Sequence, residues 1–321
     1  MKTVLTVLAM VWAVAGCTEP HADAQTPATR TQATQASIGQ TPVVPPGAQR
    51  GHGRPYEMLG TEVWDVADPV SGRDYQVFVA LPKSYRDAPQ RRYPVLYVTD
   101  ADYAFPLVRQ IARRLNGEGP AIEEFILVGL SYATGDDGMT SRRRDYTPAP
   151  TGSPDAPADA VHGKAEAYIA YLQDQVLPFV AGRYRTDEHR RLFLGHSYGG
   201  LLGTQILLTR PELFAGYVLG SPSYWFADHW MEGQESAYAR EHTDLPAKAY
   251  LYVGQYEEST YGKRYDMVSD TRRMATALRS RNYPSLRLEL DVLNDETHLT
   301  VAPRGFIHGL QYLLGVEADR S

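Results

Sequence analysis

Residues 190–210 read RRLFLGHSYGGLLGTQILLTR, and this stretch predicts the fold of the chain around it. The apolar run 192–194 is typical of the end of a buried strand, and the run 201–208 is typical of a buried helix. Between them lies the pattern G-x-S-x-G, which belongs to a sharp strand–turn–helix connection with an exposed serine hydroxyl. Gly195 and Gly199 lack the Cβ atoms that would collide in so tight a turn. We therefore predict that Ser197 is a nucleophile at the N-terminus of a helix, whose dipole favours negative charge there.

Strand-like runs alternate with helical stretches along the rest of the chain. Besides the strand before Ser197, strands are expected at 61–67, 74–81, 93–99, 125–130, 217–219, 249–253 and 286–293. Besides the helix after Ser197, helices are expected at 105–115, 168–180, 268–280 and 302–314. The turn residues Pro69, Ser71 and Gly72 make the first two strands a hairpin. The alternation predicts an α/β fold with a doubly wound, mostly parallel sheet flanked by helices.

The composition is that of an ordinary globular protein, with 321 residues, 43% hydrophobic and 22% charged. We place one domain at residues 56–321, which is long enough to bury a sizeable core. A formal net charge of −6 and a pI near 5.9 argue against nucleic acid as the main partner. Because Cys17 is the one cysteine, neither an intramolecular disulfide nor a cysteine-based metal site can form. No motif for a nucleotide or zinc is present, so we expect no cofactor and no metal.

The N-terminus has the parts of an export signal. Lys2 is followed by a short apolar stretch, 4–15, and by small residues before Cys17. The sequence Val-Ala-Gly-Cys resembles a bacterial lipobox, in which the cysteine is lipidated; a plain secretory signal is the alternative. We predict a lipoprotein-type signal peptide at 1–16, lipidation at Cys17, and a disordered Thr/Gln/Ala/Pro-rich tether at 17–55.

No Asp stands next to Cys17. By resemblance to bacterial lipoproteins, this implies an exported protein of the cell envelope, held on the outer membrane and facing the periplasm. Membrane contact is expected only through the lipid anchor.

A second catalytic residue is expected after the last predicted strand. His298 lies there, just before the final helix, where an α/β-hydrolase places its base in the chain order nucleophile, acid, histidine. The other histidines fit this role less well. His196 is expected to point away from the serine, His229 and His242 fall in a stretch predicted to be irregular, and His308 lies within a helical period.

The acid that would orient His298 is expected after the strand 249–253. Glu257, Glu258 and Asp266 all compete for this role, and a solvated acidic loop is the alternative. Asp295 and Glu296 are too close in sequence to His298 to orient it, so we expect them to shape its loop.

The oxyanion hole needs two hydrogen-bond donors aimed at the developing charge. The backbone N–H of Tyr198, directly after the nucleophile, is the first candidate. The second is expected in the turn 100–103, and we favour the N–H of Asp102.

Substrate contacts are expected from both sides of Ser197. Arg143 and Arg144, in the run 142–144, could bind an anionic substrate, although arginines before a Thr-Pro turn are more often structural. Tyr103 follows the oxyanion turn and is a further candidate. Trp225 belongs to the stretch 223–242, which reads either as an aromatic wall over Ser197 or as a packed lid.

These segments together resemble the esterase family of α/β-hydrolases, which includes siderophore, feruloyl and acetyl-xylan esterases, formylglutathione hydrolases and mycolyltransferases. The resemblance covers about residues 63–314 and lies nearest to the periplasmic trilactone siderophore esterases. The residues that carry it are YPVLY (93–97) before Asp100, RRRDYTP (142–148), GHSYGGL (195–201), RPELF (210–214), SPSYW (221–225), Gly254 with Glu257, and Thr297 with His298.

The resemblance implies an α/β-hydrolase fold and acyl-ester chemistry, and it selects Glu257 as the acid, three residues after a glycine. It also implies that siderophore esterases rely on a Ser–His dyad, which leaves the weight of the acid open. The oxyanion turn departs mildly from the family, since Asp-Ala stands where Asp-Gly is common.

We therefore predict a serine hydrolase that cleaves a small carboxylic ester, such as a siderophore-type lactone, through an acyl-serine. A siderophore-binding lipoprotein without turnover and an acyltransferase or peptidase on the same fold are the alternatives. The sequence leaves the substrate and the oligomeric state open.

Overall fold

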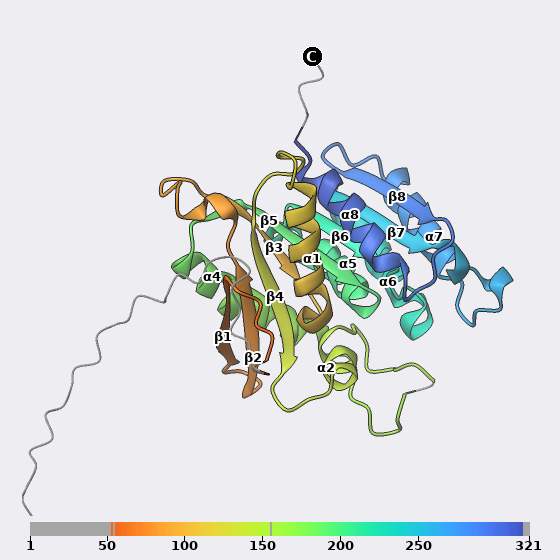
Figure 1. Cartoon of the computed structure of the whole chain (residues 1–321). Coiled ribbons are helices and arrows are strands. Elements are labelled where there is room, and N and C mark those ends of the chain that lie inside the picture. Colours follow the sequence, from red (N-terminus) through yellow and green to blue (C-terminus); the bar gives the residue numbers. More distant parts are fainter. Residues whose placement is uncertain (1–52, 54, 155, 317–321) are drawn as a thin grey trace, which may run out of the picture. The chain divides into compact units, whose positions relative to one another are not determined.

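The sheet of this protein has parallel strands at its centre and an antiparallel edge. We describe it from a computed structural model of residues 53, 55–154 and 156–316. In that part of the chain an eight-stranded sheet has the order β1-β2-β4-β3-β5-β6-β7-β8. The first two strands and the β2–β4 pair are antiparallel, and every other neighbouring pair is parallel. Helices flank the sheet (Figure 1). The predicted doubly wound α/β fold is confirmed.

The strands are β1 (Thr61–Asp68), β2 (Arg73–Ala80), β3 (Tyr93–Val98), β4 (Ile126–Ala133), β5 (Thr186–His196), β6 (Gly216–Gly220), β7 (Lys248–Gly254) and β8 (Arg287–Leu293). The α-helices are α1 (Ala101–Leu115), α2 (Gly138–Asp145), α3 (Ala165–Tyr171), α4 (Leu177–Arg183), α5 (Tyr198–Thr209), α6 (Phe226–Glu241), α7 (Met267–Ser280) and α8 (Val301–Leu314). A π-helical turn, η2 (Leu172–Val176), joins α3 to α4, and 3-10 turns lie at η1 (Lys83–Tyr85), η3 (Pro211–Leu213), η4 (Gln255–Glu257) and η5 (Ser259–Tyr261).

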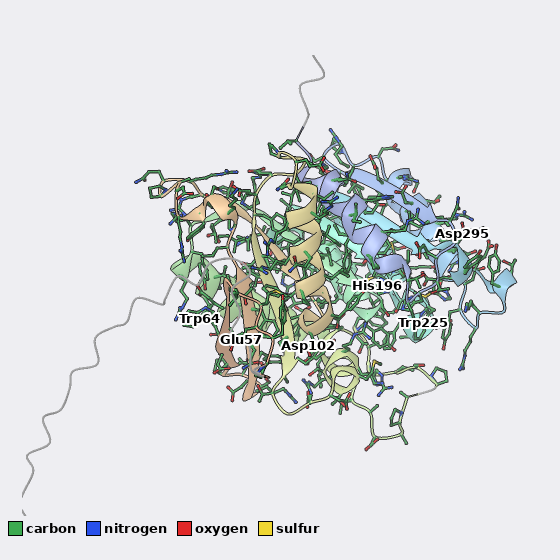
Figure 2. All side chains as sticks on the ribbon, in the orientation of Figure 1. Glu57, Trp64, Asp102, His196, Trp225 and Asp295 are labelled. Atoms are coloured by element: carbon green, nitrogen blue, oxygen red, sulfur yellow. The ribbon has the colours of Figure 1, made fainter. Side chains whose placement is uncertain are left out.

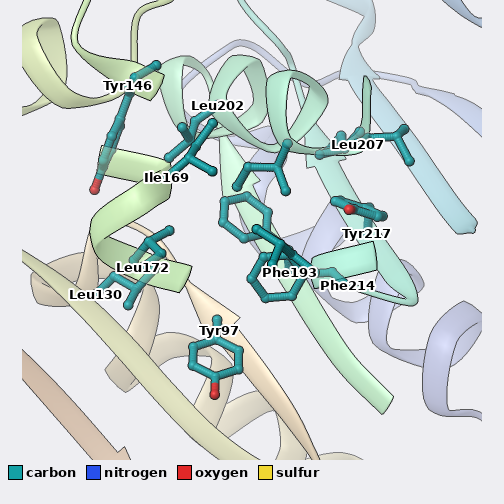
Figure 3. Packing of buried hydrophobic residues seen from close by; sticks show 14 of the residues in the cluster. Tyr97, Leu130, Tyr146, Ile169, Leu172, Phe193, Leu202, Leu207, Phe214 and Tyr217 are labelled. Atoms are coloured by element: carbon teal, nitrogen blue, oxygen red, sulfur yellow. The ribbon is translucent and has the colours of Figure 1, made fainter. Parts of the chain in front are cut away.

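The hydrophobic core consists of a layer on each face of the sheet. Tyr97 and Phe193 point to the face covered by α3, α4, α5, α6 and α7 (Figure 3). Their neighbours Val98 and Leu194 point to the other face, which α1 and α8 cover. Alternate residues of one strand face opposite sides of a sheet. Strands β3 and β6 and residues 192–195 of β5 are therefore buried on both faces, as the apolar runs in the sequence suggested.

Three helices differ from the sequence prediction. Helix α1 begins at Ala101, four residues before the expected start, because Asp100 has a left-handed backbone (φ 55°) that turns β3 directly into the helix. Helix α2 was not expected, since it is polar and has no apolar face. The predicted irregular stretch 223–242 is mostly helix α6, which contains His229; His242 caps its C-terminus. Residues Ala227–His229 have positive φ inside this helix, which obscured its start.

The predictions about the N-terminus fall mainly outside the described residues. The signal peptide at 1–16, Cys17 and nearly all of the tether at 17–55 lie there, and the domain boundary at residue 56 stays a prediction. Within the described ranges, none of the helices has the length and apolar character needed to cross a membrane.

Candidate active site

Ser197 occupies the turn between β5 and α5 in a strained backbone conformation (φ 61°, ψ −119°). A Cβ atom at Gly195 would overlap the backbone of Gly199, and one at Gly199 would overlap the Thr99 side chain. The turn can therefore close only with glycine at both positions. The N–H of Ser197 donates to the Gly220 carbonyl (2.8 Å), which ties the turn to the neighbouring strand β6.

His298 lies in the loop between β8 and α8 and is held by a buried carboxylate. Its Nδ1 lies 2.6 Å from Oε2 of Glu257, whose side chain is only 2% exposed. The other carboxylate oxygen, Oε1, accepts from the Ser221 hydroxyl (2.7 Å) and from the Gly254 N–H (2.8 Å). These bonds fix the carboxylate, so the histidine keeps one tautomer with its Nε2 free to act as a base.

The two competing acids lie elsewhere. Asp266 caps helix α7, where it accepts from the Ser269 N–H (2.8 Å). Glu258 accepts from the Thr260 hydroxyl (2.9 Å). The structure thus pairs Glu257 with His298 and gives Glu258 and Asp266 local structural contacts.

Ser197 and His298 line the same cavity, but their side chains are not hydrogen-bonded in the described part of the chain. The Ser197 hydroxyl instead lies 3.5 Å from the Ser223 hydroxyl. Hydrogen bonds between a nucleophile and its base are often loose before a substrate is bound. The arrangement therefore has the parts of a nucleophile–base–acid chain, with the first link still open.

His196 points toward the loop of His298, whereas the sequence predicted that it points away from the site. Its Nε2 lies 3.0 Å from the backbone oxygen of His298, and its Nδ1 lies 3.2 Å from the Tyr252 hydroxyl. Burial, followed by the proximity of His298, lowers the pKa of His196 to about 3. The ring is therefore neutral, with Nε2–H donating to the His298 carbonyl and Nδ1 accepting from Tyr252. The prediction was wrong because the sequence does not show that the loop of His298 folds back over the Ser197 turn.

The two expected oxyanion donors lie in the first turns of two helices. Tyr198 is the first residue of α5, where a backbone N–H has no partner within the helix. Asp102 lies in the first turn of α1 with an exposed side chain (Figure 2). It is absent from the lining of the Ser197–His298 cavity, whereas Asp100 from the same turn lines it. The turn therefore lies at the cavity, and the role of the Asp102 N–H as the second donor stays a prediction.

Asp100 and Arg142 form an ion pair at the wall of this cavity (2.9 Å). Asp100 also accepts from the Tyr132 hydroxyl (2.8 Å), and the Arg142 guanidinium lies over the Tyr198 ring, 5.5 Å from its centroid. Burial raises the pKa of Asp100, although Arg142 and Tyr132 oppose this effect. Burial works against the charge of Arg142 as well, but Asp100 keeps the pKa of Arg142 above its ordinary value. This pair was not predicted, since Arg142 is 42 positions away from Asp100 in the sequence.

The two arginines predicted to bind substrate lie in different surroundings. Arg144 is buried, and its guanidinium pairs with Asp136 (2.6 Å) and with Asp145 (2.8 Å). Arg144 lines neither cavity at Ser197, so the prediction that it binds substrate is wrong. Its ion pairs agree with the alternative, a structural role. Arg143 is half-buried and lines a cavity next to Ser197. Successive residues of α2 point in different directions, which the run of three arginines could not show.

The aromatic candidates lie on opposite sides of Ser197. Trp225, directly before α6, stacks on Tyr265 with ring centroids 4.0 Å apart. Tyr103, on the first turn of α1, is 47% exposed and lies 6.5 Å from the Phe306 ring. Each lines a cavity that Ser197 also lines.

The loop that carries His298 is held by the residues expected to shape it. The Asp295 carboxylate accepts from the Tyr256 hydroxyl (2.9 Å), and the Glu296 carboxylate lies 3.1 Å from Arg304. Among all residues that the structure describes, no three His, Cys, Asp or Glu side chains cluster as a metal site would require.

Comparison with known proteins shows to which family this chain belongs. A sequence model of the family described as "Putative esterase" matches residues 69–288. The chain belongs to this esterase family. The esterase is 27% identical over 275 residues to the ferri-bacillibactin esterase BesA of Bacillus subtilis (strain 168), with 82% of this chain and 93% of the relative covered. It is 30% identical over 158 residues to the siderophore triacetylfusarinine C esterase of Aspergillus fumigatus, with 48% and 53% covered.

Solved structures share the fold of the esterase. The BES protein from Bacillus cereus has a TM-score of 0.71 at 23% identity, over 83% of this chain and 100% of that chain. The siderophore hydrolase EstB from Aspergillus nidulans has a TM-score of 0.70 at 22% identity, over 82% and 98%. The predicted family resemblance is confirmed, the protein is a carboxylic ester hydrolase, and a binding protein without turnover is not favoured.

Proposed function

We propose that the esterase hydrolyses its substrate through an acyl-serine formed on Ser197. The observation that supports this most directly is the 2.6 Å contact between His298 and the buried Glu257, in a loop beside the strained Ser197 turn. His298 Nε2 takes the hydroxyl proton as Ser197 attacks the ester carbonyl carbon. It then returns that proton to the oxygen of the departing alcohol, and the cycle repeats with water to release the acid.

The developing oxyanion is held by backbone N–H groups. Tyr198 supplies one from the first turn of α5, and the β3–α1 turn supplies the other, with the N–H of Asp102 as the candidate. Removing one such donor typically lowers the rate by ~10²–10³.

We propose a siderophore-type lactone as the substrate. The relatives named above include siderophore esterases, and Arg143, which forms no ion pair with a described residue, lines a cavity beside Ser197. Cationic side chains suit an anionic ligand such as a catecholate or carboxylate.

Hydrolysis of 4-nitrophenyl esters from acetate to octanoate by the full chain is the first test. Ser197→Ala should abolish turnover, and Ser280→Ala, an exposed serine at the end of α7, should not change it. A fluorophosphonate should label wild type and Ser280→Ala but not Ser197→Ala. Absence of both turnover and labelling in the wild type would rule out the proposed mechanism. Trilactone siderophores, with and without iron, would then be compared with the simple ester of highest kcat/KM.

We also propose that the esterase is a lipoprotein, anchored at Cys17 to the outer membrane and facing the periplasm. The support lies in the sequence alone, where the one cysteine follows Val-Ala-Gly after a short apolar stretch. Metabolic labelling with a palmitate analogue in a bacterial host should mark the wild type and not Cys17→Ser. Equal labelling of both, or recovery of both as free periplasmic protein, would refute the anchor.

A further inference from the structure

Ser197 stands where two cavities of different chemistry meet. One has a volume of about 600 Å³ and the other of about 270 Å³. Both are lined by Ser197, Arg142 and Met139. An ester bound to Ser197 has two halves, an acyl half and an alcohol half, so the two cavities offer one place for each.

The smaller cavity, which we call the cationic cavity, is lined, in addition to the shared residues, by Arg143, Ser153, Ala156, Tyr198, Ser223, Trp225 and Tyr265. Arg143 is half-buried here and forms no ion pair with any residue that the structure describes. The stacked rings of Trp225 and Tyr265, 4.0 Å apart and inclined by 8°, form a flat wall. An unpaired, partly desolvated cation beside such a wall suits an acidic group attached to a planar or extended chain.

The larger cavity, which we call the apolar cavity, has a mainly hydrophobic wall. It includes His298 and, from α1, α8 and the His298 loop, the side chains of Tyr103, Ala104, Leu299, Ala302 and Phe306. The ionic groups on this side are Asp100 and Arg142, which are paired with each other at 2.9 Å, and Asp137, whose carboxylate accepts from the N–H and the hydroxyl of Thr140. This cavity therefore offers apolar contact and no cation that is free to bind an anionic group.

The chemistry decides which half of the ester goes where. When the bond between Ser197 Oγ and the acyl carbon forms, the bond from that carbon to the alcohol oxygen breaks, and the oxygen takes its proton from His298. The alcohol oxygen must therefore lie on the His298 side, which is the apolar cavity. The acyl half remains attached to Ser197, and the cavity that remains for it is the cationic cavity.

We propose that the esterase binds the acyl half of its substrate in the cationic cavity, where Arg143 selects an acyl group that carries negative charge, and releases the alcohol half through the apolar cavity. This assignment rests on the proposed acyl-serine mechanism. It has a kinetic consequence that separates the two cavities. Arg143 acts on acylation and on deacylation, because the acyl group is present in both steps, whereas the apolar cavity acts on acylation, after which the alcohol has left.

The acyl half is tested with two substrates that share one alcohol, 4-nitrophenyl hydrogen adipate and 4-nitrophenyl heptanoate. Arg143→Gln should lower the ratio of kcat/KM for the anionic over the neutral ester about tenfold. Arg240→Gln, an exposed arginine near the end of α6, removes the same charge away from the site and should leave the ratio as in the wild type.

The alcohol half is tested by following acylation and deacylation separately in stopped flow, with 4-nitrophenyl and 1-naphthyl esters of one acid. Tyr103→Ala should slow acylation several-fold more than deacylation, whereas Arg143→Gln should slow both steps for the adipate.

Each outcome decides between the proposals. Turnover that depends on Ser197 but shows equal loss for both acids in Arg143→Gln would overturn the cavity assignment and leave the mechanism standing. An effect of Tyr103→Ala on deacylation as large as on acylation would also overturn it, since it would place the acyl half on the His298 side. Absence of acyl-enzyme formation in the wild type would instead refute the proposed mechanism.

Discussion

The carboxylate of Glu257 tests how far the esterase depends on an acid behind its histidine. Glu257→Gln keeps the shape of the side chain but can present an amide N–H to His298 Nδ1, which favours the wrong tautomer. We expect kcat to fall by ~10²–10⁴, in the range known for such a replacement in triads. Glu258→Gln, the neighbouring residue in the same loop, should change kcat less than about twofold. A loss of less than tenfold in Glu257→Gln would show that the Ser–His dyad suffices.

His196 is a positioning residue, because it contacts the backbone of His298 and not the reacting atoms. Its Nε2–H donates to the His298 carbonyl at 3.0 Å. His196→Gln can restore a donor near this point, whereas His196→Phe fills the space without one. We expect kcat to fall about tenfold or more in His196→Phe and much less in His196→Gln. KM should change little in either, since both side chains are close in size to the histidine that they replace in the wall of the apolar cavity. Equal kcat in both variants, or a loss confined to KM, would contradict this role.

At the scale of elements, helix α6 begins with a strained turn next to the cationic cavity. Ala227, Asp228 and His229 all have left-handed backbones (φ 49°, 54° and 60°), which cost non-glycine residues free energy. Asp228 is fully exposed, so glycine can replace it without loss of packing. We expect Asp228→Gly to raise the free energy of unfolding by up to about 1 kcal/mol, measured by urea denaturation. Asp74→Gly, an exposed aspartate of strand β2 without positive φ, should lower it instead. Destabilisation by Asp228→Gly would contradict the strain.

The elements also show what the sequence could predict. Buried strands and the Ser197 turn were predicted because apolar runs and glycine spacing are local signals, and the core confirms the strands. Helices α2 and α6 were missed, because one is polar throughout and the other begins with left-handed residues. In the site, the chain order placed His298, but the contacts of His196, Ser221 and Arg142 depend on how distant loops meet. No local pattern encodes such contacts, although SPS at 221–223 did mark the segment that supplies Ser221.

At the scale of the whole molecule, His196 should make folding sensitive to acid. Burial and the nearby His298 hold its pKa at about 3 in the folded protein, whereas an unfolded chain has the ordinary value of about 6.5. Above pH ~6.5 the ring is neutral in both states and contributes no pH dependence. Between pH ~6.5 and ~3 the unfolded state binds a proton that the folded state does not, so the free energy of unfolding falls as the pH falls, with a limiting slope of about 1.4 kcal/mol per pH unit.

This acid sensitivity is isolated by comparing wild type with His196→Gln in urea denaturation from pH 8 to pH 4. The two proteins share every other titrating group, so the difference between their free energies of unfolding reports position 196. We expect that difference to be constant above pH ~6.5 and to shift in favour of His196→Gln as the pH falls, because glutamine takes up no proton. A difference that stays constant down to pH 4 would mean that His196 becomes protonated as easily in the folded protein as in the unfolded chain. The assignment of a neutral His196 ring that donates to the His298 carbonyl would then be wrong. The hydrogen bond that links the Ser197 turn to the loop of the catalytic base would be wrong as well.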